Sequence, residues 1–334
     1  MQRLTQEGPS LTVEVLDVDH YHPLVRAIRN VLSTPLAEVT YAQLIDGLPI
    51  VDTVWDMRGS LLLRGHPLID HDRLCEGALE RALRSRDTFD PAILRFDSIV
   101  MQSYQKATLG TREFKLRLVE LVAKSVHQIA VLLSQLDDKL HSKEDIHAVV
   151  SWKKESQWVV EGRRRVFEEA LKPRPTLFYH VDYMDYEQYP EGMADVAGYW
   201  AEDRIFGGIV VFDRGESGSE CNDIYFHSGR QQTTFRVWRL LDDQFTDLVD
   251  FLLADNPPKP PFPILASQAN RHRHDPWDAI ALHHVFRDPW ERRFPSTKPE
   301  ETRDVRTVGD YPELDDMFDA LQSADEAGHD ADSN

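Results

Sequence analysis

"TREFKLRLVELVAKSVHQIAVLLSQLDDKL", residues 111–140, is the stretch that decides the fold class. Gly110 and Thr111 stand at its start, where a hydroxyl side chain can accept hydrogen bonds from the first free amides of a helix. Its apolar residues recur at three- and four-residue steps, which places them along one side of an α-helix. They are Phe114, Leu118, Leu121, Val122, Val126, Ile129, Leu132, Leu133, Leu136 and Leu140. We therefore predict a long core helix over 111–140.

The chain on both sides of this helix also carries helical patterns. Residues 24–32 and 72–82 have apolar stripes, and the segment 144–172 continues as helix until "KPRPT" (172–176). Each proline there removes a backbone donor and disfavours helix before it. Only "LTVEVLDV" (11–18) alternates apolar and polar residues as a strand does. Residues 1–172 are thus predicted to be mainly helical.

The composition changes after residue 175, where Val, Ile, Phe, Tyr and Thr become frequent and glycines separate the runs. These runs predict an antiparallel sheet over 176–240, with Gly229 in a hairpin turn. A helix over 242–254, with Asp242 as its N-cap, is expected to close the sheet. The predicted fold class is α+β: a helical N-terminal part packed on a small antiparallel sheet, then a C-terminal helix and an extended proline-rich tail.

We predict one α+β domain over 1–255, helical over 1–172, with the sheet and closing helix over 173–255. "NPPKPPFP" (256–263) begins a proline-rich strap with tryptophan-containing loops that extends to residue 300. Residues 301–334 are acidic and polar, and we expect them to be largely disordered.

The charge and the cysteines bound the functional class. With 57 acidic and 38 basic side chains the formal net charge is −19, which disfavours nucleic acid and anionic membranes as partners. The two cysteines, Cys75 and Cys221, form neither a disulfide framework nor a CxxC pair. The sequence has no signal-peptide pattern and no apolar run of about 18 residues. We therefore expect a soluble cytoplasmic protein, with the nucleus as the alternative compartment.

The His-X-Asp pattern formed by His180 and Asp182 raises the possibility of an iron site. Together with His227 these residues could occupy one face of Fe(II) in a 2-oxoglutarate-type oxygenase, with Arg236 holding the co-substrate. However, only 45 positions separate residues 182 and 227, which is tight for the strands of such a barrel. Residues two apart in a strand also share a face, so His180 and Asp182 can simply pair. We favour this second interpretation and predict no cofactor outside the iron alternative.

Two further segments are candidates for binding. Aromatic and acidic residues crowd the segment 179–206, which could line a pocket for an apolar or cationic small molecule or could pack a sheet edge. Near the end of the chain an apolar stripe at i, i+3, i+4 and i+7 could dock on a partner protein or pack on its own domain. Its residues are Leu314, Met317, Phe318 and Leu321.

The remaining histidines carry weaker signals. We expect His127, in the middle of the long helix, to be a polar or core position. The pairs in "HYH" (20–22), "RHRH" (271–274) and "HH" (283–284) lack the spacing of structural zinc sites. Dinucleotide, P-loop and HExxH motifs are likewise missing from the sequence.

The block "YHVDYMDYEQYPEGMADVAGYWAEDRIFGGIVVFDRG" (179–215), followed by "DIYFHSGRQQTTFRVWRLLDDQ" (223–244), resembles a family of uncharacterised intracellular proteins of filamentous ascomycete fungi. The resemblance implies a fungal intracellular protein and brings no catalytic residue with it. It suggests an accessory role, linked by association alone to specialised metabolism. We expect such an accessory protein, with the iron oxygenase and the partner-binding protein as alternatives, and the sequence leaves open whether it is an enzyme.

Overall fold

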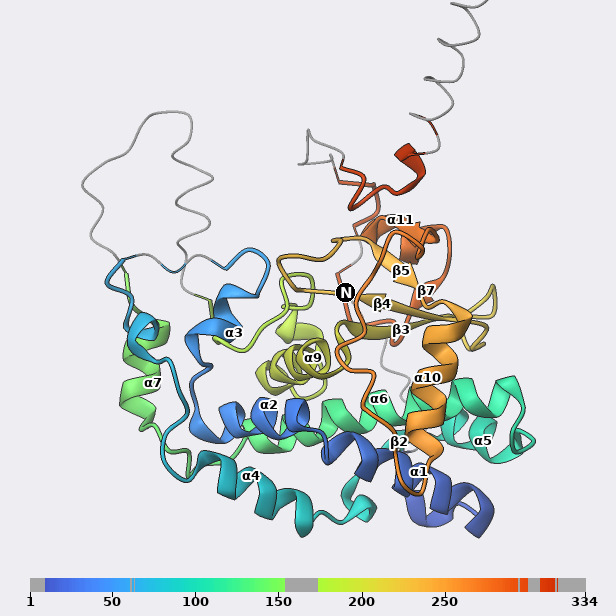
Figure 1. Cartoon of the computed structure of the whole chain (residues 1–334), viewed down its shortest axis with the longest axis horizontal. Coiled ribbons are helices and arrows are strands. Elements are labelled where there is room, and N and C mark those ends of the chain that lie inside the picture. The colour runs from blue at the N-terminus through green and yellow to red at the C-terminus, as the bar shows by residue number, and fades with distance from the viewer. Residues whose placement is uncertain are drawn as a thin grey trace, which may run out of the picture.

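The structure is a computed structural model, and it describes residues 10–60, 62, 64–153, 174–293, 295–299, 307–315 and 317. It confirms the α+β class: a layer of helices packs against a small antiparallel sheet. The helical layer is built by α1 (Val18–Leu32), α2 (Pro35–Asp46), α4 (Ala78–Asp87) and α6 (Arg112–Ser134). Between this layer and the sheet lies α9 (Met193–Phe206), which contacts α2, α6 and β3 (Figure 1).

The helix predicted over 111–140 is present as α6, and its start is as predicted. The hydroxyl of Thr111 accepts a hydrogen bond from the amide of Phe114. The helix ends at Ser134, six residues before the predicted end. Asp137 and Asp138 follow, and carboxylates are unfavourable beside the negative end of a helix dipole. Leu136 and Leu140 pack against the core from outside the helix.

The sheet has the strand order β6-β5-β4-β3-β7, and every neighbouring pair is antiparallel. Its strands are β3 (Ile209–Asp213), β4 (Ile224–His227), β5 (Val237–Arg239), β6 (Arg273–His274) and β7 (Val285–Phe286). Phe226 of β4 lies opposite Trp238 of β5, and both side chains are fully buried. The predicted hairpin through Gly229 therefore corresponds to the connection between β4 and β5.

Three predicted segments differ from the structure. Residues 176–183 are not a strand of the sheet; His180 and Tyr183 form only an isolated bridge across a turn. The expected strand over 11–18 is limited to β1 (Ser10–Leu11), which pairs with β2 (Phe96–Asp97) before a 3-10 helix at Val13–Val15. The segment expected to be a strap and loops supplies both edge strands of the sheet, β6 and β7.

The helix α9 was not predicted, and its burial explains why. Every residue from 195 to 206 is buried, including Glu202, Asp203 and Arg204. A helix buried on all sides shows no polar face, so its apolar residues do not form the stripe that reveals a surface helix. The aromatic and acidic crowding over 179–206 is therefore largely the signature of a central helix.

Shorter elements complete the described chain. The closing helix α10 (Asp242–Leu253) is present where the sequence predicts it, but its N-cap is Leu241 and Asp242 is its first residue. The other helices are α3 (Val51–Trp55), α5 (Ser98–Lys106), α7 (Lys143–Val150) and α11 (Pro276–Ala281), with 3-10 turns η2 (Pro67–Asp70), η3 (Pro91–Ile93) and η4 (Tyr186–Gln188). The helix predicted over 144–172 is seen as α7, and its part beyond residue 153 lies outside the described residues. Among the described helices none is both long and apolar enough to cross a membrane.

Candidate functional site

The predicted iron triad is brought together by the fold. The Nε2 atom of His227 lies 3.2 Å from Oδ2 of Asp182, and Nδ1 of His180 lies 3.9 Å from the same oxygen. The two imidazole rings are 5.2 Å apart between centroids. Both histidines are buried, whereas 31% of the Asp182 side chain is exposed.

The donor atoms of these residues nevertheless do not fit a three-ligand iron site. The Nε2 atom of His180 donates to the carbonyl of His227 at 3.2 Å, and its Nδ1 accepts from the amide of Asp182 at 3.2 Å. Both ring nitrogens are thus occupied by the backbone, and burial lowers the pKa of His180 to about 4, so the ring is neutral. Only Asp182 and His227 remain as donors, fewer than a facial triad requires.

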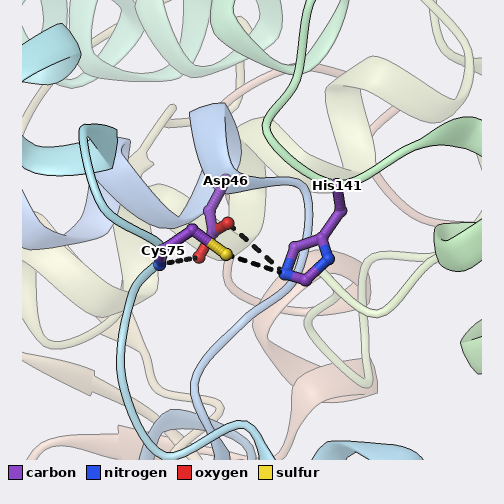
Figure 2. Close-up of side chains that lie close together, drawn as sticks. All are labelled: Asp46, Cys75 and His141. Carbon is purple, nitrogen blue, oxygen red and sulfur yellow. Dashed lines mark hydrogen bonds and ion pairs between the residues drawn. The ribbon is translucent and has the colours of Figure 1, made fainter.

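Within the described part of the chain, one group of three side chains places its ligand atoms within 4.8 Å of one another, and it is not the predicted triad. The group consists of Asp46, Cys75 and His141 (Figure 2). The sequence analysis singled out none of the three as a metal ligand.

Arg236, the predicted co-substrate anchor, directly precedes β5 and contacts the C-terminal segment. Its Nε is 3.1 Å from Asp275, and its Nη1 donates to Glu313 at 2.9 Å. The guanidinium also lies 4.3 Å above the ring of Tyr311. These contacts tie residues 311–313 to the sheet and occupy the guanidinium.

Part of the predicted partner-binding stripe is described. Leu314 is half-buried, and 48% of Met317 is exposed. Phe318 and Leu321 lie outside the described residues.

A cleft of about 500 Å³ opens between α6, α9 and the segments 93–97 and 287–290. Four residues of the crowded segment 179–206 line it: Pro190, Glu191, Asp195 and Tyr199. Phe96 and Trp290 add aromatic surface from elsewhere in the chain. This volume and this mixture of apolar walls with a few polar groups are typical of small-molecule sites.

His127 of α6 lies at the floor of the cleft between two carboxylates. In its protonated form it donates through Nδ1 to Glu202 at 2.8 Å and through Nε2 to Asp195 at 2.9 Å. Burial alone would lower the pKa of His127, but the hydrogen bonds to Asp195 and Glu202 outweigh it and raise this pKa above its ordinary value. The ring fits here because residue 198 is glycine: a Cβ there would lie 2.6 Å from the imidazole.

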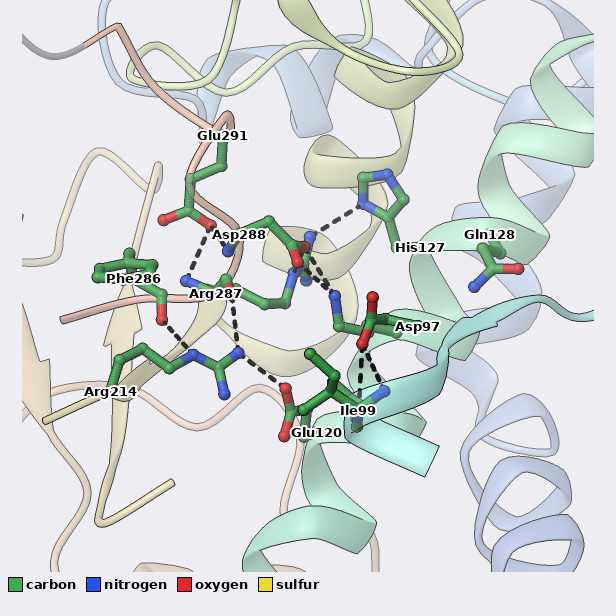
Figure 3. Close-up of polar contacts among 12 residues, drawn as sticks. Asp97, Ile99, Glu120, His127, Gln128, Arg214, Phe286, Arg287, Asp288 and Glu291 are labelled. Carbon is green, nitrogen blue, oxygen red and sulfur yellow. Dashed lines mark hydrogen bonds and ion pairs between the residues drawn. The ribbon is translucent and has the colours of Figure 1, made fainter. Parts of the chain in front are cut away.

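Arg287 and Asp288, from the segment after β7, also line the cleft, and Figure 3 shows their polar contacts. The Nη1 atom of Arg287 donates to both carboxylate oxygens of Glu202 at 2.7 Å. The ammonium of Lys124 donates to both oxygens of Asp288 at 2.6 and 2.8 Å. Burial opposes the ionisation of Asp288, but Lys124 and Arg287 hold the pKa of this carboxyl well below its usual range. The cationic groups Lys124 and Arg287 are therefore each paired with a carboxylate at the floor of the cleft.

A second ion-pair cluster supports this wall from behind. Arg214 donates to Glu120 at 2.7 Å and to the carbonyl of Arg287 at 2.7 Å. Arg117 completes the cluster by donating to Glu120 at 2.8 Å. The bond from Arg214 fixes the backbone carbonyl of Arg287, whose side chain is bonded to Glu202 on the cleft side.

Comparison of the chain with models of protein families, with curated proteins and with solved structures finds no match. The function must therefore be argued from the geometry of the site alone. The sequence did contain a signal for the cleft: Glu120, Lys124 and His127 are charged or polar residues at i, i+4 and i+7 of a core helix, so they share one face. Polar residues on one buried face need partners from another element. Arg214 supplies the partner of Glu120, Asp288 that of Lys124, and α9 those of His127.

Proposed function

We propose that the protein binds a small organic cation with an aromatic or apolar body in the cleft between α6 and α9, without transforming it. The observation that carries this proposal is the composition of the lining. Carboxylates of Asp97, Glu191 and Asp195 border the cleft together with the aromatic rings of Tyr199 and Trp290. Aromatic faces and carboxylates are the groups that recognise ammonium ions.

The charge of the lining supports a cation over an anion. Lys124 is matched by Asp288 and Arg287 by Glu202, so neither is free to receive an anionic ligand, and Arg95, the third cation of the lining, donates to the carbonyls of Ala92 and Leu94. At the rim, the exposed carboxylate of Glu191 accepts one hydrogen bond from the described residues, from Gln135 at 3.2 Å. The formal net charge of −19 adds a long-range attraction for cations.

The same pairing favours binding over catalysis. A general base or nucleophile needs a free lone pair within reach of the reacting atom. Both ring nitrogens of His127 are bonded to carboxylates, and Lys124 is bonded to Asp288. An accessory role, as expected from the sequence, is consistent with such a site. The proposed binding function involves neither iron nor 2-oxoglutarate.

The test compares three probes of the same size and different charge: benzylamine, benzyl alcohol and benzoate. Isothermal titration calorimetry of the full chain should rank their affinities in that order, with benzylamine at least about tenfold tighter than benzoate, which is about 1.4 kcal/mol. Benzoate binding equally well or better would contradict the proposal. So would benzylamine binding that is unchanged in a Trp290→Ala variant of normal thermal stability.

A further inference from the structure

Four potential metal ligands converge where the helical layer meets the loops around it. Asp46 is the last residue of α2, and Cys75 precedes α4. His71 follows the 3-10 turn at Pro67–Asp70, and His141 lies in the segment between α6 and α7. Figure 2 shows Asp46, Cys75 and His141 pointing toward one another from these separate segments.

The ligand atoms of Asp46, Cys75 and His141 all lie within 4.8 Å of one another, close enough to share one ion. The Sγ of Cys75 is 3.3 Å from Nε2 of His141, and this nitrogen is 3.5 Å from Oδ1 of Asp46. The Nε2 of His71 is 3.4 Å from Oδ2 of Asp46. With metal–ligand bonds of about 2.0–2.3 Å, neighbouring ligand atoms of a tetrahedron lie about 3.3–3.6 Å apart.

The hydrogen bonding of the cluster is incomplete in the way a missing ion would explain. Asp46 is fully buried, yet its Oδ1 has no hydrogen-bond partner among the described residues. The same holds for Nε2 of His71. The described ion pairs of Asp46 are to His71 and His141 and include neither lysine nor arginine. Buried polar atoms are satisfied in the great majority of cases, so two unpaired atoms on neighbouring side chains are consistent with a shared metal partner.

We propose that Asp46, Cys75 and His141 bind a Zn²⁺ ion, with His71 as the fourth ligand. One thiolate, two imidazoles and one carboxylate form a mixed sulfur, nitrogen and oxygen set, which suits zinc and is unsuited to Ca²⁺ or Mg²⁺. Four protein ligands make a closed site, and closed zinc sites are structural. On binding, Cys75 releases its thiol proton to solvent.

Hydrogen bonds of the backbone hold the ligand residues close to one another. The amide of His141 donates to the carbonyl of Asp46 at 2.9 Å, and the amide of Cys75 donates to Oδ2 of Asp46 at 3.1 Å. Gly47 reverses the chain directly after Asp46 with a φ of 99°, a conformation that other residues rarely adopt. The ion therefore joins the end of α2, the segment 66–75 and the segment after α6.

The test measures the metal directly. The full chain, expressed in zinc-supplemented medium and purified without chelators, should contain about one zinc per chain by elemental mass spectrometry. After removal of zinc, Co²⁺ should give tetrahedral d–d bands and a thiolate charge-transfer band. Less than about a tenth of a zinc per chain, together with no such spectrum, would overturn the proposal.

Matched variants identify the ligands. Cys75→Ser and His141→Ala should each weaken zinc binding by at least about 100-fold, and His141→Cys should restore it because a thiolate is also a zinc ligand. Cys221→Ser and His147→Ala, at the other cysteine and at an exposed histidine of α7, should leave binding unchanged. Equal zinc in Cys75→Ser and wild type would contradict the assignment. Should the ligand variants fail to fold, the Co²⁺ charge-transfer band of the wild type alone decides whether a thiolate binds the metal.

His71 has its own test. His71→Ala should still bind Co²⁺ but with shifted d–d bands, because water replaces an imidazole. An unchanged spectrum would remove His71 from the ligand set.

Discussion

The floor of the cleft and the corner at Asp46 both bury charged and polar side chains, but they do so in opposite ways. In the cleft, His127 is hydrogen-bonded to Asp195 and Glu202, and Arg287 donates to Glu202 and Asp288. In the corner, two buried polar atoms are left without a hydrogen bond, and the ligand atoms lie close enough to share one ion. A satisfied cluster stabilises the protein as it stands, whereas unpaired buried atoms among closely spaced ligand atoms favour a bound ion.

The sharpest way to break this comparison is to remove Arg287. Arg287→Ala leaves Glu202 as a buried carboxylate that has lost its only arginine partner among the described residues. Breaking a buried ion pair typically costs about 3–5 kcal/mol, so urea unfolding should show a loss of this size. Arg293→Ala is the control: that side chain is 61% exposed and pairs with Asp185 and Glu187, so its loss should be at most about 1 kcal/mol. Equal losses for the two variants would show that the pair at the floor is not structural.

A methyl group at residue 198 tests the packing of His127 at the floor of the cleft, with a smaller expected loss of stability. The Cβ of Gly198→Ala would lie 2.6 Å from the His127 ring, so the ring or α9 must shift. Overpacking of this kind costs about 1–3 kcal/mol. Gly309→Ala, whose Cβ meets nothing closer than 3.6 Å, should be neutral in the same unfolding assay. A neutral Gly198→Ala would mean that His127 has more room than its contacts indicate.

The pH dependence of the two buried histidines sharpens the contrast further. His127 has a raised folded-state pKa, so its contribution to stability is fully present below its unfolded value near 6.5 and is lost as the pH rises through the folded pKa. His180 has a folded pKa of about 4, so its contribution is present above about 6.5 and is lost as the pH falls toward 4. Histidine NMR titration should therefore find that His127 loses its proton at a higher pH than an ordinary histidine and that His180 is neutral at pH 6. The reverse order of titration would contradict both environments.

The smallest expected effect lies at the rim of the cleft. Glu191→Gln should weaken benzylamine binding about two- to fivefold, since an exposed charge is screened by solvent and contributes about 0.2–1 kcal/mol. Glu187→Gln, an exposed carboxylate paired with Arg293, is the matched control and should leave the affinity unchanged. An equal effect of both changes would indicate that only the overall charge matters.

The sequence predicts elements that carry a regular local pattern of apolar residues. The helix α6 and its Thr111 cap were predicted in this way, as were the closing helix and the β4–β5 hairpin. The helix α9 could not be predicted by the same rule because both its apolar and its charged residues are buried. The edge strands β6 and β7 are two residues long, too short for alternation to be read.

The candidate sites depend on contacts between distant parts of the chain. Asp46 and His141 are 95 positions apart, and their meeting follows from the packing of α2 against α6 rather than from any local spacing. The spacing His71-x-x-x-Cys75 was the one local signal for that corner. Conversely, His180 and Asp182 gave a strong local pattern, but the backbone occupies both nitrogens of His180. Local motifs thus give residue types, and only the fold decides which lone pairs remain free.

The most direct test of this account is anomalous scattering at the zinc absorption edge from a crystal of the full chain. We predict one strong anomalous peak about 2.0–2.3 Å from Cys75 Sγ, His141 Nε2 and a carboxylate oxygen of Asp46, and no peak beside His227. A map with no peak at the corner, or with its peak between Asp182 and His227, would contradict the central claim that the metal site of this protein lies at Asp46, Cys75 and His141.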